Sequence, residues 1–117
     1  MQQYGLPLEK VENVEIKGKK YAKLTSGFLR PDNKKLYFYY DWQEETFMDR
    51  WAAYTSAIGK PVDLAVFDWV AARYHCQRGK LSNFNELQSD DPVALIQAML
   101  AVYAWYEMKE WLTDGFD

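Results

Sequence analysis

The sequence predicts an α+β domain in which an N-terminal three-stranded antiparallel meander is followed by three main α-helices packed on it. Apolar residues recur with period two between residues 11 and 42, which is typical of strands. After residue 43 they recur with the helical period of 3.6. No stretch rich in Gly, Pro or Ser divides the 117 residues. We therefore expect residues 1–117 to form a single compact domain, with the meander at 11–42 and the helical part at 43–117.

Two turn signals divide the meander into strands. Apolar residues alternate with charged ones at 14–17 and with tyrosines at 36–40. Gly18 supplies the positive φ of a tight hairpin, and Pro31-Asp32-Asn33 provides a second turn. Ser26-Gly27 interrupts the long middle strand and predicts a bulge there.

The first helix is predicted from residue 41 to about residue 58. Asp41 and Glu44 fit a capping box, and Gly59 follows the predicted end. The apolar stripe of this helix consists of Phe47, Trp51, Tyr54 and Ile58. On the same helical wheel, the side chains expected to face water are Glu45, Asp49 and Arg50.

Two further helices are expected, joined by a short turn at 82–87. The second helix spans about 62–78 and ends before Gly79, which we expect in a left-handed conformation. The third begins with Pro92 at its first position and is apolar on both sides over 92–112. We expect it at the centre of the domain, with a homodimer formed through this helix as the alternative.

The charge of the chain changes sign along its length. Residues 1–40 carry eight basic against four acidic side chains, whereas residues 41–117 carry six against thirteen. The formal net charge of -3 hides this asymmetry. Exposed charge acts on partners through its long-range field, so the asymmetry bears on association rather than on fold.

Several chemistries lack the residues they need. One cysteine allows no internal disulfide, and one histidine leaves no second imidazole for a zinc site. The glycines lie at least nine positions apart, so neither a P-loop nor a dinucleotide-binding loop can form. His75 and Cys76 are neighbours and do not face each other on a helix. We therefore expect no enzyme activity, no cofactor and no metal.

Metal-dependent nuclease chemistry is retained only as a third alternative. Glu15-Ile16-Lys17 would place both polar side chains on one face of a strand. A Mg²⁺ site needs a further acidic ligand, and the sequence offers none at a suitable position.

The sequence favours a cytoplasmic location. The N-terminal ten residues contain no apolar run of the kind found in signal peptides. The longest uncharged apolar stretch, 92–106, is shorter than the roughly twenty residues that cross a bilayer.

Two sets of residues could contact a partner. The first combines aromatics on the outward face of the meander with an acidic helix surface: Tyr21, Tyr37, Tyr39, Glu44, Glu45 and Asp49. The tyrosines could also be core, protein interface or a stacking platform for bases. The second set would neutralise phosphates of a single-stranded nucleic acid: Lys17, Lys19, Lys20, Lys23 and Lys35. The acidic pI of about 5.2 argues against a dedicated nucleic-acid binder.

By elimination, the sequence favours a small cytosolic, non-enzymatic protein-binding module. We expect a stoichiometric inhibitor of a larger protein or nucleoprotein complex, such as an anti-CRISPR-like anti-defence protein of a phage or mobile element. A toxin-neutralising immunity protein and a single-stranded nucleic-acid-binding protein are the alternatives.

Overall fold

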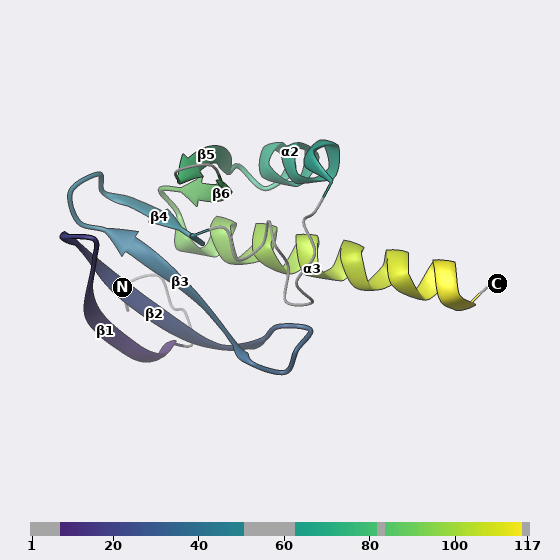
Figure 1. Cartoon of the computed structure of the whole chain (residues 1–117), viewed down its shortest axis with the longest axis horizontal. Helices are drawn as coiled ribbons and strands as arrows, with labels where there is room; N and C mark the ends of the chain where they lie inside the picture. Colours follow the sequence, from purple (N-terminus) through teal and green to yellow (C-terminus); the bar gives the residue numbers. More distant parts are fainter. Residues whose placement is uncertain (1–7, 51–62, 82–83, 116–117) are drawn as a thin grey trace.

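A six-stranded antiparallel sheet and two helices form the part of the chain that the computed structural model describes, residues 8–50, 63–81 and 84–115 (Figure 1). In chain order the elements are β1 (Leu8–Ile16), β2 (Lys19–Leu29), β3 (Lys35–Asp41), β4 (Thr46–Met48), α2 (Leu64–Arg73), β5 (Gln77–Leu81), β6 (Phe84–Ser89) and α3 (Pro92–Gly115). The strands lie in the order β1-β2-β3-β4-β6-β5. The α+β class is confirmed, but the predicted architecture of three helices on a three-stranded meander is wrong.

The three predicted strands of the meander are present. Lys17 and Gly18 have φ values of 52° and 81°, so both central residues of the β1–β2 hairpin adopt positive φ. The expected bulge lies in β2, where its pairing with β3 shifts between Thr25 and Leu29. At this point the Ser26 hydroxyl donates a 2.8 Å hydrogen bond to the carbonyl of Leu36.

The predicted helix at 41–58 is wrong over its described residues. The Asp41 carboxylate accepts hydrogen bonds from the backbone N–H groups of Gln43 (2.9 Å) and Glu44 (3.1 Å), as a helix cap would. The same bonds also close an Asx turn, and here the chain reverses through Glu45 at φ 53° into β4. The local signal was therefore real, but it marks a hairpin. Residues 51–58 lie outside the described part.

The second helix ends earlier than predicted. α2 stops at Arg73, and His75, not Gly79, is the left-handed residue, with φ 60°. The N–H groups of His75 and Cys76 donate to the carbonyls of Ala72 (3.5 Å) and Ala71 (2.7 Å), which is the Schellman pattern. The chain then forms β5, which contains Gly79, and β6, which occupies residues 84–87 of the predicted turn, while residues 82–83 lie outside the described part.

Replacing His75 by glycine is expected to raise the free energy of unfolding by about 1 kcal/mol. A side chain in the left-handed conformation carries a steric cost that glycine avoids. Urea denaturation measures the change, and His75→Ala, which keeps a Cβ, should give no such gain. Equal effects of the two substitutions would contradict the assigned backbone conformation.

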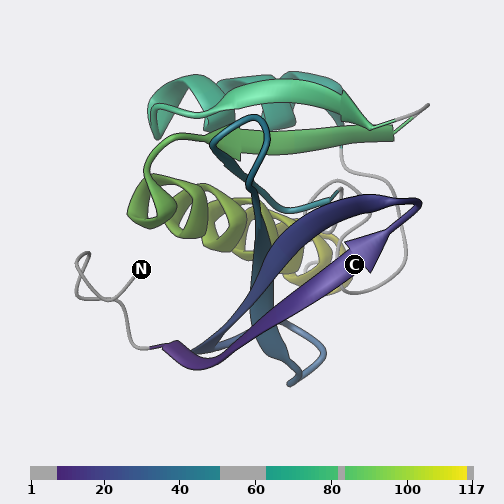
Figure 2. The same ribbon diagram turned by 90° about the vertical axis from the view of Figure 1, so that its left-hand side faces the viewer.

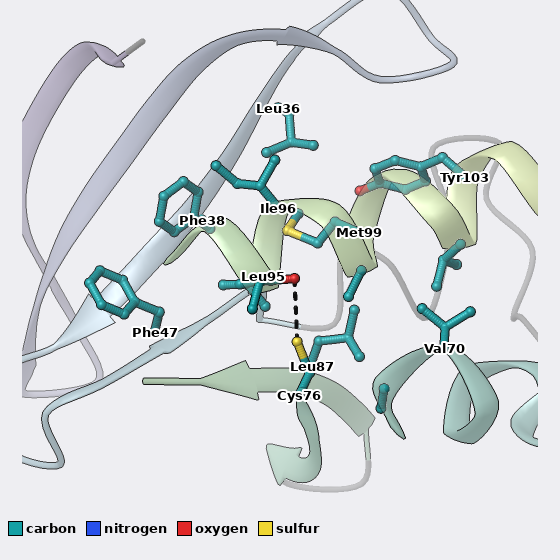
Figure 3. Close-up of a cluster of buried hydrophobic side chains, with 14 of the residues drawn as sticks. Leu36, Phe38, Phe47, Val70, Cys76, Leu87, Leu95, Ile96, Met99 and Tyr103 are labelled. Carbon is teal, nitrogen blue, oxygen red and sulfur yellow. Dashed lines mark hydrogen bonds between the residues drawn. The ribbon is translucent and has the colours of Figure 1, made fainter. Parts of the chain in front are cut away.

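The third helix is present and lies against the sheet, as predicted. α3 starts at Pro92, and its buried residues pack against β2, β3, β4, β6 and α2 (Figure 3). Phe38, Leu87, Leu95 and Met99 are completely buried in this core. Between residues 94 and 106, the buried side of α3 is thus covered by elements of the same chain. Neither described helix has the length and apolarity that crossing a bilayer requires.

Both helices lie on the same side of the sheet. In Figure 2 the strands stand in front, and α2 and α3 lie behind them. Because side chains alternate along a strand, half of the strand residues point away from these helices. The candidate site is on that opposite side, which we call the open face.

Candidate binding face

The pairing register defines the residues of the open face. Leu24 of β2 and Phe38 of β3 pair with each other and are buried against the helices. The neighbouring pair, Lys23 and Tyr39, must point the other way. Through the β3–β4 and β4–β6 pairs, Tyr39 is followed by Met48 and then by Gln88 on this face.

Three tyrosines form a row across β2 and β3, which we call the tyrosine ladder. The ring centroids of Tyr21 and Tyr39 lie 6.1 Å apart, and those of Tyr39 and Tyr37 lie 6.0 Å apart. Both contacts are edge-to-face, with interplanar angles of 73° and 89°. This geometry is favourable for aromatic pairs and holds the rings rigidly. The prediction that these tyrosines share one sheet face is confirmed.

Cationic groups lie over the ladder. The Lys23 Nζ is 4.4 Å from the centroid of Tyr37. The Arg50 guanidinium lies 5.3 Å from the ring of Tyr21 and 5.8 Å from that of Tyr39. Each distance is within the range of cation–π attraction. Tyr21 is buried at 6% exposure, whereas Tyr37 and Tyr39 are partly exposed, so these two rings form the aromatic surface, with positive charge beside it.

A cleft of about 290 Å³ adjoins the ladder at Tyr21, and we call it the charged cleft. Its lining comes from β2, β3, the β3–β4 turn, β4, the segment after β4, and β6: Lys19, Tyr21, Asp41, Glu44, Thr46, Met48, Arg50, Glu86 and Gln88. Three carboxylates and two cationic side chains thus meet in it. The cleft depends on β6 joining β4 in the sheet.

Asp41 and Lys19 neutralise each other inside the cleft. The Lys19 Nζ lies 2.7 Å from the Asp41 Oδ2. Burial by itself raises the pKa of Asp41, but the bond from Lys19 and the two backbone N–H donors outweigh it, so that its pKa lies below the ordinary value. The hydrogen bond to Asp41 raises the pKa of Lys19. Both groups are therefore charged at neutral pH and satisfied within the protein.

Glu86 is not satisfied in this way. The side chain is only 4% exposed, and its Oε1 accepts a 2.8 Å hydrogen bond from the Gln88 amide. The Oε2 is buried and has no hydrogen-bond partner. Burial raises the pKa of Glu86 above its ordinary value. Gly79 faces Glu86 across β5 and β6, and a Cβ at Gly79 would overlap the Gln88 amide.

Glu86→Gln is expected to raise the melting temperature at pH 8 and to change it less at pH 4. A carboxyl group whose pKa is raised on folding favours the folded state below its unfolded pKa, and this contribution is lost as pH rises through the folded pKa. The neutral amide removes the unpaired charge and keeps an acceptor for Gln88. Thermal unfolding followed at both pH values measures the difference. A larger gain at pH 4 than at pH 8 would show that the carboxylate is not destabilised.

The three predicted acidic contacts do not lie together. Glu44 lines the cleft, and Glu45 is exposed in the β3–β4 turn. Asp49 was expected to face water, which is wrong: it is completely buried on the helix side of the sheet. Its Oδ1 accepts a 2.9 Å hydrogen bond from the N–H of Leu87, and its own N–H donates to the Leu87 carbonyl at 3.2 Å. Asp49 therefore extends the link between β4 and β6.

The five predicted lysines are also dispersed. Lys19 and Lys23 belong to the open face, whereas Lys35 pairs with Glu9 at 2.9 Å on the exposed surface. Lys17 and Lys20 border a shallow hollow at the tip of the β1–β2 hairpin, shared with Lys19, Gly18, Gln43 and the exposed Trp42. The aromatic neighbour of the hairpin lysines is thus Trp42.

Sequence reasoning missed Glu86, Arg50 and Gln88. No local pattern marks them, because Glu86 and Gln88 reach the open face through the β4–β6 pairing and Arg50 reaches it through the β3–β4 pairing. The segment 84–89 has apolar residues only at 84 and 87, so it lacks the period of two that would have indicated a strand.

Cys76 lies in the core and Glu15 lies on an exposed strand, and neither belongs to the charged cleft. The Cys76 thiol is buried and donates to the Ala94 carbonyl at 3.5 Å (Figure 3). Burial raises its pKa to about 11, so that it is a neutral thiol at pH 7. Glu15 is exposed on β1, opposite Lys20. Within the described ranges, no three His, Cys, Asp or Glu side chains are grouped so that they could hold a metal ion.

Comparisons with protein-family models, curated proteins and solved structures give no match to this chain.

Proposed function

We propose that the protein is a non-enzymatic, cytoplasmic protein-binding module that docks onto a larger protein or nucleoprotein complex through the open face. The tyrosine ladder is the observation that carries this proposal. Tyr37 and Tyr39 are partly exposed on a sheet face that neither described helix covers. Tyrosine combines a large apolar contact area with a polar tip and loses little conformational entropy when it is buried in an interface.

Within this class, the proposal is a stoichiometric inhibitor, such as an anti-CRISPR-like anti-defence protein of a phage or mobile element. A toxin-neutralising immunity protein is the alternative. Small size and the net charge of -3 support this choice, because the long-range field of an acidic protein favours its association with basic, nucleic-acid-processing proteins. Charge attraction of this kind predicts association that slows as salt is raised.

Affinity capture from a lysate of the encoding organism tests the docking face. The immobilised full chain is compared with Tyr37→Ala and Tyr39→Ala, and retained proteins are quantified by mass spectrometry. Loss of a central interface tyrosine is expected to cost about 2 kcal/mol, or roughly thirtyfold in affinity. Trp69→Ala is the matched control, since Trp69 is 63% exposed on α2, away from the open face.

The proposal fails if the two tyrosine variants retain the same proteins at the same level as the unaltered chain. A loss confined to Trp69→Ala would instead place the contact on α2. Circular dichroism of each variant confirms that its fold is unchanged.

The hairpin tip supports single-stranded nucleic-acid binding as a second candidate. Trp42 is 54% exposed beside Lys17, Lys19 and Lys20, so a base could stack where phosphates are neutralised. Titration of labelled oligo(dT) at low and high salt tests this function. Binding that weakens linearly in log salt and is lost in Trp42→Ala supports it, and no binding at low salt removes it.

A further inference from the structure

We propose that the charged cleft receives the guanidinium group of an arginine side chain of the docked partner, with the unpartnered Glu86 Oε2 as its main acceptor. This inference rests on the proposed function, because the cleft opens on the same face as the tyrosine ladder and shares Tyr21 with it.

The hydrogen-bonding state of Glu86 favours binding of a donor group from outside the protein. A buried carboxylate oxygen without a donor carries a desolvation penalty that a satisfied one does not. Gln88 engages one oxygen of Glu86, and the other oxygen is buried at the wall of the cleft without a donor. A hydrogen-bond donor supplied by the partner would remove this desolvation penalty. Because the free protein already carries the penalty, its removal makes the free energy of binding more favourable.

The charged groups that line the cleft give it a net negative charge. Lys19 is committed to Asp41, and the Arg50 guanidinium is held over the rings of Tyr21 and Tyr39. Glu44 and Glu86 therefore give the lining one more negative than positive group. The charged groups that act on Glu86 are Arg50, Asp41 and Lys19, all of which line the cleft and are included in this balance. The cleft favours a cation over an anion.

The volume of the cleft and its burial favour a guanidinium group over other cations. A volume of about 290 Å³ is at the lower limit of small-molecule pockets, and it suits one side-chain head group better than a nucleotide. Guanidinium has five donors in a plane and is weakly hydrated, so it tolerates burial next to a carboxylate and an aromatic ring. An ammonium group is more strongly hydrated, so it loses more hydration free energy on entering the cleft.

Titration of acetyl-arginine amide into the ¹⁵N-labelled full chain tests the inference. We expect saturable NMR shifts at the Gln88 side-chain amide and the Glu86 backbone, with millimolar affinity. Acetyl-citrulline amide has nearly the same shape without the charge and should cause much smaller shifts. Guanidinium chloride at the same concentrations shows how much of the effect a bare cation produces.

Binding of acetyl-arginine amide is also measured in two variants and as a function of pH. Glu86→Gln is expected to weaken binding at least about tenfold, and Trp69→Ala should leave it unchanged. If Glu86→Gln alters the fold, the unaltered protein still gives a test, since binding should weaken as acid protonates Glu86. This pH dependence should persist in Glu44→Gln, and Asp41 keeps its charge over more of the range because its pKa is lowered.

Equal shifts with citrulline, or unchanged binding in Glu86→Gln, would overturn the inference. An equal response to guanidinium chloride would also overturn it in its specific form, because the cleft would then select a bare cation and not an arginine side chain. These failures are separate from failure of the docking face, which the tyrosine variants decide without arginine.

Discussion

Replacing Phe38 by alanine is expected to lower the free energy of unfolding by about 3–5 kcal/mol. Phe38 is completely buried on β3, and its ring centroid lies 6.1 Å from that of Phe47 on β4. It belongs to the core that joins the sheet to α3. Removal of the ring leaves a cavity between two rigid layers that cannot close fully.

Urea denaturation followed by circular dichroism measures this loss. Trp69→Ala is again the control, because an exposed side chain outside the core should change stability by less than about 0.5 kcal/mol. A loss below about 1 kcal/mol for Phe38→Ala would mean that α3 does not pack on this face of the sheet.

Asp49→Lys is expected to destabilise the fold by about 4 kcal/mol or more. The substitution buries a cation in the core and removes the acceptor of the Leu87 N–H group. Asp49→Asn keeps a side-chain oxygen acceptor and should cost less. Glu45→Lys, at an exposed position of the β3–β4 turn, should stay within about 0.5 kcal/mol.

This comparison separates the observed sheet from the helix that the sequence predicts. On a helix at 41–58, Glu45 and Asp49 would share a solvated face, and their charge reversals would have similarly small effects. Similar stabilities of the two lysine variants would therefore contradict the β4–β6 arrangement.

The strands of the meander and the last helix were predictable because their signals are local and long. β2 and β3 alternate over many residues, and Pro92 opens a helix of 24 residues. The β1–β2 turn follows directly from the Gly18 backbone.

The middle of the chain was not predictable from local patterns. Asp41 makes the same hydrogen bonds in an Asx turn as at a helix cap, so the capping-box signal cannot distinguish the two. β4 has three residues, too few to show a period, and it becomes a strand by pairing with β3 and β6. Which distant segment such a short strand pairs with is decided by tertiary context and cannot be predicted from the segment alone.

The candidate site also contains some residues that local patterns predict and others that they do not. Tyr37 and Tyr39 alternate within one strand, so their common face could be predicted. Glu86 lies in β6 and reaches the cleft because β6 pairs with β4, whereas Arg50 follows β4 and reaches the ladder because β4 pairs with β3.

Hydroxyl-radical footprinting of the protein with and without its captured partner tests the central claim most directly. Tyr37 and Tyr39 should lose most of their oxidation in the complex, while Trp69 and Met108, both exposed on the helices, should remain as reactive as before. Protection of Trp69 and Met108 with unchanged oxidation of the two tyrosines would contradict a docking surface on the open face.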